Sequence, residues 1–318
     1  MLAGILIGEE RSVNDAVNMT RLAEELGFDS VWFGEHVGIR DALVMSSLAL
    51  ASTKKISVGT CAINVYTRNI GTVLASVNTL DSYYPKRFML GIASGEEVLN
   101  NFGIVKKSPL NEMKEFLLNL KALFSGEIVN YEGSFIKLRQ AKGEKKLNVP
   151  IYLAATGPKM LSLGSKFADG VILNFLTTYQ YVEQAHKIIG NVKSFQLIAA
   201  FIEKNNSLET AKEFLSKFFF LAPEFFKSMG ISENIILSAK SKIRAWPPEK
   251  IELEEASKEI PDEVVKKLIA TGKGKEVIKF TKELISPWGS YPIFYIVSED
   301  YAYAIEEISS TMNKNINN

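Results

Sequence analysis

The chain has 318 residues, of which 47% are hydrophobic and 23% are charged, as in ordinary globular proteins. Its 37 Lys plus Arg against 36 Asp plus Glu give a formal net charge of +1, which argues against nucleic-acid binding because that function needs a basic surface. Its single cysteine, Cys61, excludes an intrachain disulfide and a cysteine-rich zinc site and favours a reducing, cytoplasmic setting.

The N-terminal residues lack the pattern of a signal peptide, and no stretch reaches the roughly 18 apolar residues of a membrane span. We therefore expect a protein with no membrane association and with small molecules as its ligands.

Short apolar runs alternate with segments of helical periodicity along the first part of the chain. Gly27 stands where a helix ends on a left-handed residue, and Asp41 stands where a side chain caps the start of a helix. The alternation predicts strands over 2–7, 30–35, 56–63 and 88–93, and helices over 13–26, 42–51, 70–84 and 111–124.

The pattern changes twice in the rest of the chain. Two short strand-like runs over about 127–140 predict a hairpin excursion, and a proline-punctuated stretch over about 221–258 predicts a helical insertion. Otherwise the alternation predicts strands over 149–156, 170–175, 195–203 and 291–297, and helices over 159–167, 179–189, 208–219, 264–270, 275–284 and 301–312.

These elements make about eight strand–helix units. Strands that are apolar along their whole length are buried on both faces, as in parallel sheets covered by helices. We therefore predict an α/β fold, a single (β/α)8 TIM barrel over residues 1–318. A doubly wound open sheet is the alternative, but Gly8-Glu9-Glu10 after the first strand is a poor substitute for the glycine fingerprint of dinucleotide-binding sheets.

Active sites of such barrels lie where strands run into the following loops. Glu35 and His36 follow the second predicted strand, and Gly95 and Glu96 follow the fourth. His36 and Glu96 are candidates for moving a proton, although a histidine at this position can also be a structural hydrogen-bonding group. The other histidine, His186, lies on an amphipathic helix and is expected at the surface.

A glycine turn follows the fifth predicted strand. Pro158 stands at the first position of the next helix, where its missing N–H costs nothing. The free N–H groups of that first turn, after Thr156 and Gly157, can bind a phosphate. An ordinary strand-to-helix turn is the alternative interpretation.

Several of these segments together resemble the bacterial luciferase-like superfamily, and within it the coenzyme F420-dependent oxidoreductases that include methylene-tetrahydromethanopterin reductase. The resemblance covers about residues 1–200. It is carried by VWFGEH (31–36), GTCAINVYTRNIGTVLASVNTLD (59–81), RFMLGIASGE (87–96), AATGPKML (154–161) and ADGVILN (168–174).

The resemblance implies a deazaflavin or FMN at the carboxyl ends of the barrel strands. It implies a cis peptide bond between Cys61 and Ala62, forming a bulge behind the cofactor ring, and a cofactor phosphate on the turn at 156–158. The residues it places at the cofactor are Cys61, Ala62, Ile63, Asn64, Gly95, Thr156, Gly157 and Pro158, and those it places at the reaction are Glu35, His36 and Glu96.

The chain departs from the family pattern at two positions. Asn69 stands where the family has a histidine, and Leu6 stands where methylene reductases have an acidic residue. The second departure weighs against a pterin substrate.

The resulting hypothesis is an F420-dependent oxidoreductase that transfers a hydride between the cofactor and a small carbon substrate. The alternatives are an FMN-dependent monooxygenase of the same fold and a non-catalytic flavin-binding protein. Luciferase-like relatives commonly pair through helices on one flank of the barrel, so the resemblance also implies a homodimer.

Overall fold

A computed structural model describes residues 1–95, 97–202 and 207–314 of the chain. The chain divides into two compact units, which are treated separately here. The first unit comprises residues 2–173 and 185–195, and the second comprises residues 174–184 and 196–318 together with Met1. Among the described residues, no helix combines the length and the apolar character needed to cross a membrane.

The first unit is built on parallel strands that pair in chain order. They are β1 (Gly4–Ile7), β2 (Ser30–Phe33), β3 (Ser57–Thr60), β5 (Phe88–Ala93), β8 (Ile151–Ala155) and β9 (Gly170–Leu173), and the short β4 (Ile63–Asn64) pairs with β5. Every residue of β1, β2 and β9 is buried, which is why these strands are apolar along their whole length.

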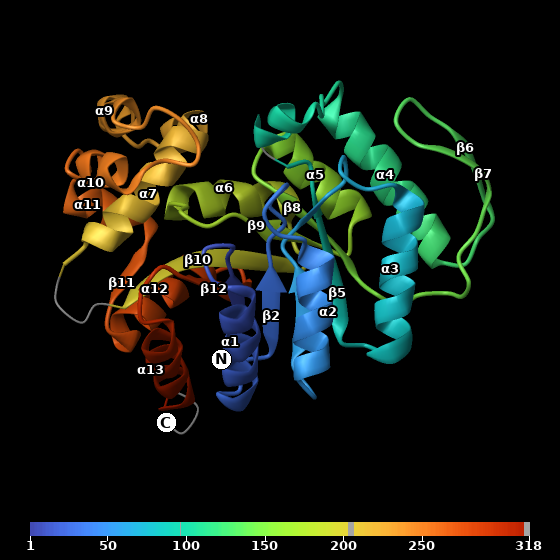
Figure 1. The fold of residues 1–318 in the computed structure, drawn as a ribbon, viewed down its shortest axis with the longest axis horizontal. Helices are drawn as coiled ribbons and strands as arrows, with labels where there is room; N and C mark the ends of the chain where they lie inside the picture. The colour runs from blue at the N-terminus through green and yellow to red at the C-terminus, as the bar shows by residue number, and fades with distance from the viewer. Residues whose placement is uncertain (96, 203–206, 315–318) are drawn as a thin grey trace. The chain divides into compact units, whose positions relative to one another are not determined.

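Helices follow these strands as predicted (Figure 1). They are α1 (Val13–Glu25), α2 (Ala42–Ser52), α3 (Ile70–Tyr83), η1 (Glu97–Phe102), α4 (Pro109–Phe124) and α5 (Pro158–Phe167). The side chain of Asp41 caps α2, and Gly27 follows α1 with a φ of 81°, so both predicted end signals are confirmed.

The predicted hairpin is also present, as the antiparallel strands β6 (Val129–Glu132) and β7 (Lys137–Ala141). Glu115 of α4 ties its turn down by accepting hydrogen bonds from the backbone N–H groups of Ser134, Phe135 and Ile136.

In the second unit, β11 (Ala270–Gly272) pairs in parallel with β10 (Ser194–Ile202). The stretch at 221–258 is helical, as predicted. The remaining elements of this unit are β12 (Tyr291–Ile296) and the helices α7 (Glu209–Leu221), α8 (Pro223–Ser228), α9 (Glu233–Ser241), α10 (Lys250–Ser257), α11 (Asp262–Leu268), α12 (Gly274–Ile285) and α13 (Tyr301–Lys314). The helix α6 (Tyr179–Ile189) is divided between the units after residue 184.

Two expectations are wrong. The predicted helix over 264–270 ends at Leu268, and Ala270 instead begins β11 opposite Ala200. His186 is only 6% exposed, because it shares the buried side of α6 with Val182, Ala185 and Ile189. That burial lowers the pKa of His186 to about 4, so the imidazole is neutral at physiological pH.

Every strand predicted from the sequence is present, and each one outside the hairpin is followed by helical structure. The paired core strands of the first unit are parallel to one another. Parallel strands that alternate with helices are typical of the predicted (β/α)8 barrel. The expectation that residues 1–318 form one domain stays a prediction.

Candidate active site

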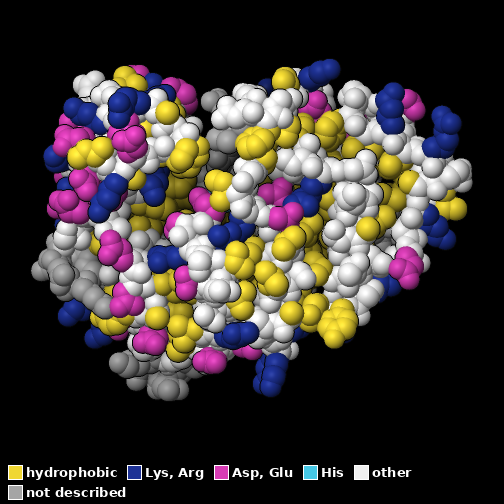
Figure 2. Space-filling view, viewed as in Figure 1, with side chains coloured by type: hydrophobic (Ala, Val, Ile, Leu, Met, Phe, Trp, Pro, Cys, Tyr) yellow, Lys and Arg dark blue, Asp and Glu magenta, His cyan; other side chains and the backbone are white. Residues whose placement is uncertain are grey.

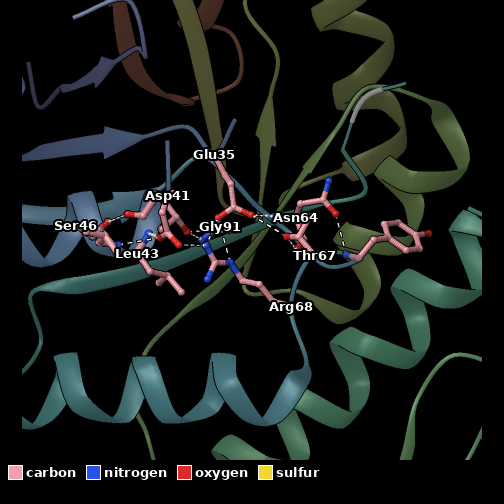
Figure 3. A network of polar contacts seen from close by, with 12 residues as sticks. Glu35, Asp41, Leu43, Ser46, Asn64, Thr67, Arg68 and Gly91 are labelled. Atoms are coloured by element: carbon pink, nitrogen blue, oxygen red, sulfur yellow. Dashed lines mark hydrogen bonds and ion pairs between the residues drawn. The ribbon is translucent and has the colours of Figure 1, made fainter. Parts of the chain in front are cut away.

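Glu35, the second residue after β2, is enclosed by donors (Figure 3). Its Oε1 accepts hydrogen bonds from the Asn64 N–H at 3.2 Å and the Thr67 hydroxyl at 3.0 Å. Its Oε2 accepts from Nε of Arg68 at 3.1 Å and from Nη2 of the same side chain. With its side chain only 5% exposed, Glu35 ties the end of β2 to the segment that follows β3.

Arg68 continues this network to the start of α2. Its Nη2 also donates to Asp41 Oδ2 at 2.7 Å, while Asp41 Oδ1 accepts from the N–H groups of Leu43 and Val44. Burial alone would raise the pKa of Asp41, but the hydrogen bonds from Val44 and Arg68 outweigh it and hold the pKa below its ordinary value. Burial would lower the pKa of Arg68, but its hydrogen bonds to the Glu35 and Asp41 carboxylates outweigh that effect. The pKa of Arg68 is therefore raised. Both shifts favour the charged forms of Asp41 and Arg68.

His36 follows Glu35 and makes a different contact. Its Nδ1 lies 3.3 Å from Oε2 of Glu9, which is the second residue after β1. The two side chains are 35% and 26% exposed, and Nε2 of His36 has no hydrogen-bond partner in the part of the chain that the structure describes. Nδ1 makes no hydrogen bond within the described residues, so the Glu9 contact is a close approach of the carboxylate to the ring that leaves Nε2 for a substrate.

Sequence reasoning missed Glu9. Its position at a strand end, two residues beyond β1, was the available signal, and it was considered only as part of a failed glycine fingerprint.

A tight turn after His36 forms the wall of a cavity. The N–H of His36 donates to the carbonyl of Arg40 at 3.0 Å, and the N–H of Arg40 donates back at 2.8 Å. Gly38 at its tip has a φ of 79°, and a Cβ there would lie 2.6 Å from the Phe102 ring. The cavity measures about 400 Å³ and is lined by residues 35–41, 67 and 68.

The segment after β3 contains the expected cis peptide bond between Cys61 and Ala62. Nearby backbones approach closely, because Thr60 Oγ1 accepts from the N–H of Gly91 at 2.9 Å and a Cβ on Gly91 would collide with the Thr60 carbonyl. Burial raises the pKa of the Cys61 thiol to about 12, so this thiol is neutral and not a nucleophile.

Ile63 and Asn64 form β4, which lies beside Ile92 and Ala93 of β5. Gly95 follows β5 with a φ of 67°, and a Cβ there would overlap the Asn64 side chain. Glu96, the next residue and a predicted proton donor, lies outside the described residues.

The predicted phosphate turn has the expected order, with Thr156 after β8 and Pro158 opening α5. Gly157 caps the helix without a side chain, and its first turn is exposed. Its φ is −83° and a Cβ there would meet nothing within 4 Å, so the folded chain itself does not require glycine.

The site therefore assembles in one unit from the carboxyl ends of neighbouring strands. The pairing of β2 with β3 brings Glu35 and His36 next to the 61–64 segment. The hydrogen bond from the Asn64 N–H to Glu35 then joins the two. The turn at 156–158 follows β8, which pairs with β5. No group of three or more His, Cys, Asp or Glu side chains among the described residues could hold a metal ion.

Known proteins resemble this chain in sequence and in fold. A 5,10-methylenetetrahydromethanopterin reductase of Methanolobus tindarius is 35% identical over 176 residues, which are 55% of this chain and 54% of the relative. An F420-dependent glucose-6-phosphate dehydrogenase of Microbacterium testaceum is 31% identical over 182 residues, 52% of this chain and 53% of the relative. The chain thus spans about half the length of the curated relatives it matches.

Among solved structures, the coenzyme F420-dependent tetrahydromethanopterin reductase of Methanopyrus kandleri matches with a TM-score of 0.86 at 20% identity, covering 97% of each chain. An F420-dependent secondary alcohol dehydrogenase in complex with an F420–acetone adduct matches with a TM-score of 0.75 at 19% identity over 98% of each chain. At these identities the likeness establishes the fold, which is the predicted (β/α)8 barrel.

The family model described as luciferase-like monooxygenase matches residues 3–287, nearly the whole chain. On that match, and with the fold agreeing, this chain belongs to the luciferase-like family.

Proposed function

We propose that the protein is a coenzyme F420-dependent oxidoreductase that moves a hydride between the cofactor and a small carbon substrate. The observation that carries the proposal is the Glu9–His36 pair, which lies beside the close-packed backbone of residues 60–64 at the carboxyl ends of adjacent strands. Two of the proteins named above support F420 as the cofactor. The Microbacterium testaceum dehydrogenase and the Methanopyrus kandleri reductase are both described as F420-dependent.

The residues present fit a flat, phosphate-bearing cofactor. Cys61, Ala62 and Gly95 would face the ring, because glycine and small side chains leave the backbone open to close approach. Ile63 and Asn64, the other predicted contacts, are 0% and 5% exposed and would lie behind these residues. Thr156, Gly157 and Pro158 would hold the phosphate, since an exposed first helical turn with open space at Gly157 presents N–H groups to an anion. When bound, F420 supplies a carbon that accepts or donates a hydride.

The protein's own part is to hold and move the substrate proton. Nε2 of His36 faces no described protein partner and can donate to, or accept from, a substrate oxygen, while Glu9 keeps the ring oriented through Nδ1. Glu96 stays a second candidate for this proton. Glu35 was predicted beside them, but both of its oxygens already accept protein hydrogen bonds, so we propose that it is a positioning residue.

The acidic group at the start of the site comes from a different position than in methylene reductases. Leu6 is buried within β1 and 5% exposed, whereas Glu9 supplies a carboxylate beyond the strand end. We therefore propose a small carbon compound as the substrate, and the buried Leu6 continues to weigh against a pterin.

Direct titration of the purified chain with F420 and with FMN, followed by absorbance, tests the cofactor. We expect F420 to bind more tightly, and His36→Gln to lower turnover by about 10²-fold or more with F420 affinity unchanged. Lys187→Gln, an exposed change on α6, is the matched control. Tighter FMN binding with oxygen consumption would replace the proposal by the monooxygenase alternative.

We propose in addition that the chain forms a homodimer through α2. This helix, ALVMSSLALAS, has no charged residue, and its outer side exposes Val44 by 57% and Leu48 by 40% (Figure 2). The exposed side of α2 combines these two apolar side chains with Ser47, and exposed apolar side chains that gather on one helix mark a surface for protein contact. Light scattering at micromolar concentration should give twice the chain mass, and Leu48→Glu should give the monomer; a wild-type monomer would refute the proposal.

The single cysteine supports the cytoplasmic location expected above.

A further inference from the structure

We infer that the cavity beside His36 is a subsite for an anionic group of the substrate, a carboxylate or a phosphate, and that Arg40 is the residue that binds it. The inference rests on the proposed function only in calling that ligand the substrate; the subsite itself follows from charges and geometry within the first unit.

The carboxylates that line the cavity are matched, whereas Arg40, which also lines it, has no ion-pair partner among the described residues. Glu35 is satisfied by Arg68, Thr67 and a backbone N–H, and Asp41 is satisfied by Arg68 and two N–H groups of α2. Within the described residues, Nη1 of Arg40 and Nδ1 of His36 are both enclosed by the protein and lack a hydrogen-bond partner. A buried donor without a partner is unfavourable, and a guanidinium binds carboxylate and phosphate oxygens better than any other side chain does.

The backbone places Arg40 next to the proposed proton donor. His36 and Arg40 exchange two backbone hydrogen bonds as an antiparallel pair, and side chains of such a pair leave the backbone on the same face with Cβ atoms about 5 Å apart. The turn cannot relax easily, because Gly38 has a left-handed φ and its Cα packs against the Phe102 ring. A ligand whose polar carbon lies at His36 therefore has its anionic end within reach of Arg40.

The size of the cavity limits the ligand. The volume of about 400 Å³ is at the lower end of small-molecule sites, although the cavity is open to solvent, and Val37 and Ile39 contribute apolar side chains to its lining. This favours a short substrate with one anionic end over a long chain or a polymer.

Calorimetric titration of the whole chain with malonate and with inorganic phosphate, without cofactor, tests the subsite. We expect both anions, or one of them, to bind to the wild type, and malonamide, the neutral analogue of malonate, not to bind. Arg40→Gln should weaken anion binding by about 10- to 100-fold, the usual effect of losing a charged hydrogen-bonding pair. Arg40→Lys should retain part of the affinity, and Arg21→Gln on the exposed side of α1 should retain all of it. The anion that binds more tightly identifies the chemical class.

Proton NMR of the two histidines gives an independent readout. Malonate or phosphate should shift the His36 ring signals and leave those of the buried His186 unchanged, and Arg40→Gln should abolish the shift. The inference is overturned if the wild type binds neither anion, or if Arg40→Gln binds them as the wild type does. Because no cofactor is present, failure of F420 to bind would refute the proposed function and leave this result intact.

Discussion

Replacing Glu35 by glutamine separates a positioning carboxylate from a catalytic one. The change keeps the shape of the side chain but removes the charge that accepts four hydrogen bonds, two of them from Arg68. Breaking a buried ion pair by removing one partner costs about 3–5 kcal/mol, but Arg68 keeps Asp41, which is 42% exposed. We therefore expect a loss of about 2–3 kcal/mol in the free energy of unfolding.

For a chain of 318 residues, that loss corresponds to a melting temperature lower by about 3–5 °C. Urea unfolding followed by circular dichroism measures the free energy, and calorimetry measures the melting temperature. Glu9→Gln is the matched control: its side chain is 26% exposed with one ionic contact, so it should change stability by less than about 0.5 kcal/mol while lowering turnover by about 10²-fold or more.

Glu35→Gln should therefore lower the stability of the protein, whereas Glu9→Gln should lower turnover and leave the stability nearly unchanged. A Glu35→Gln protein that unfolds at the wild-type urea concentration but has lost turnover would refute the reasoning and restore Glu35 to the catalytic role that the sequence suggested.

Three further outcomes are expected. Because the pKa of His186 is lowered on folding to about 4, protonation favours the unfolded chain, so stability should fall by up to about 3 kcal/mol as the pH drops from 6.5 to 4; His186→Gln should flatten that dependence in pH-resolved urea titrations. Gly157→Val, at an ordinary φ with open space, should weaken F420 binding at least tenfold while its melting temperature changes by less than 2 °C, and unchanged affinity would leave only an ordinary turn. Asp41→Ala should cost about 1–2 kcal/mol in unfolding free energy because it removes the α2 cap and one partner of Arg68, and an unaltered urea midpoint would contradict the capping role.

The fold could be predicted from the sequence because its information is local. Apolar runs of strand length, glycine at the end of α1 and Asp41 at the start of α2 each specify nearby backbone geometry. The errors arose where tertiary contacts decide. Ala270 joins a strand because β10 offers it a partner, and His186 is buried because its side of α6 packs inward, a pattern visible in its spacing from Val182 and Ile189.

The sequence predicted where the candidate-site residues lie but not which side chains they contact. Proximity to a strand end placed both Glu35 and His36 correctly, but it could not show that donors from residues 64–68, about thirty residues later in the chain, saturate Glu35. It also could not show that Glu9, from the loop after another strand, reaches Nδ1 of His36. Such pairings depend on which strands become neighbours, and that follows from the assembled sheet.

The environments of the two carboxylates assign their roles. Both oxygens of Glu35 already accept hydrogen bonds from Arg68, Thr67 and the backbone, which fits the proposed positioning role of holding the loops in place. Glu9 has one ionic partner, an imidazole whose other nitrogen is open, so a proton arriving at His36 meets a compensating charge. Arg40 adds an unpaired positive charge on the same turn, where it would favour a substrate that carries its own negative charge. Proton transfer and substrate selection would then lie within one five-residue segment, and changing either His36 or Arg40 alone should disturb one function and spare the other.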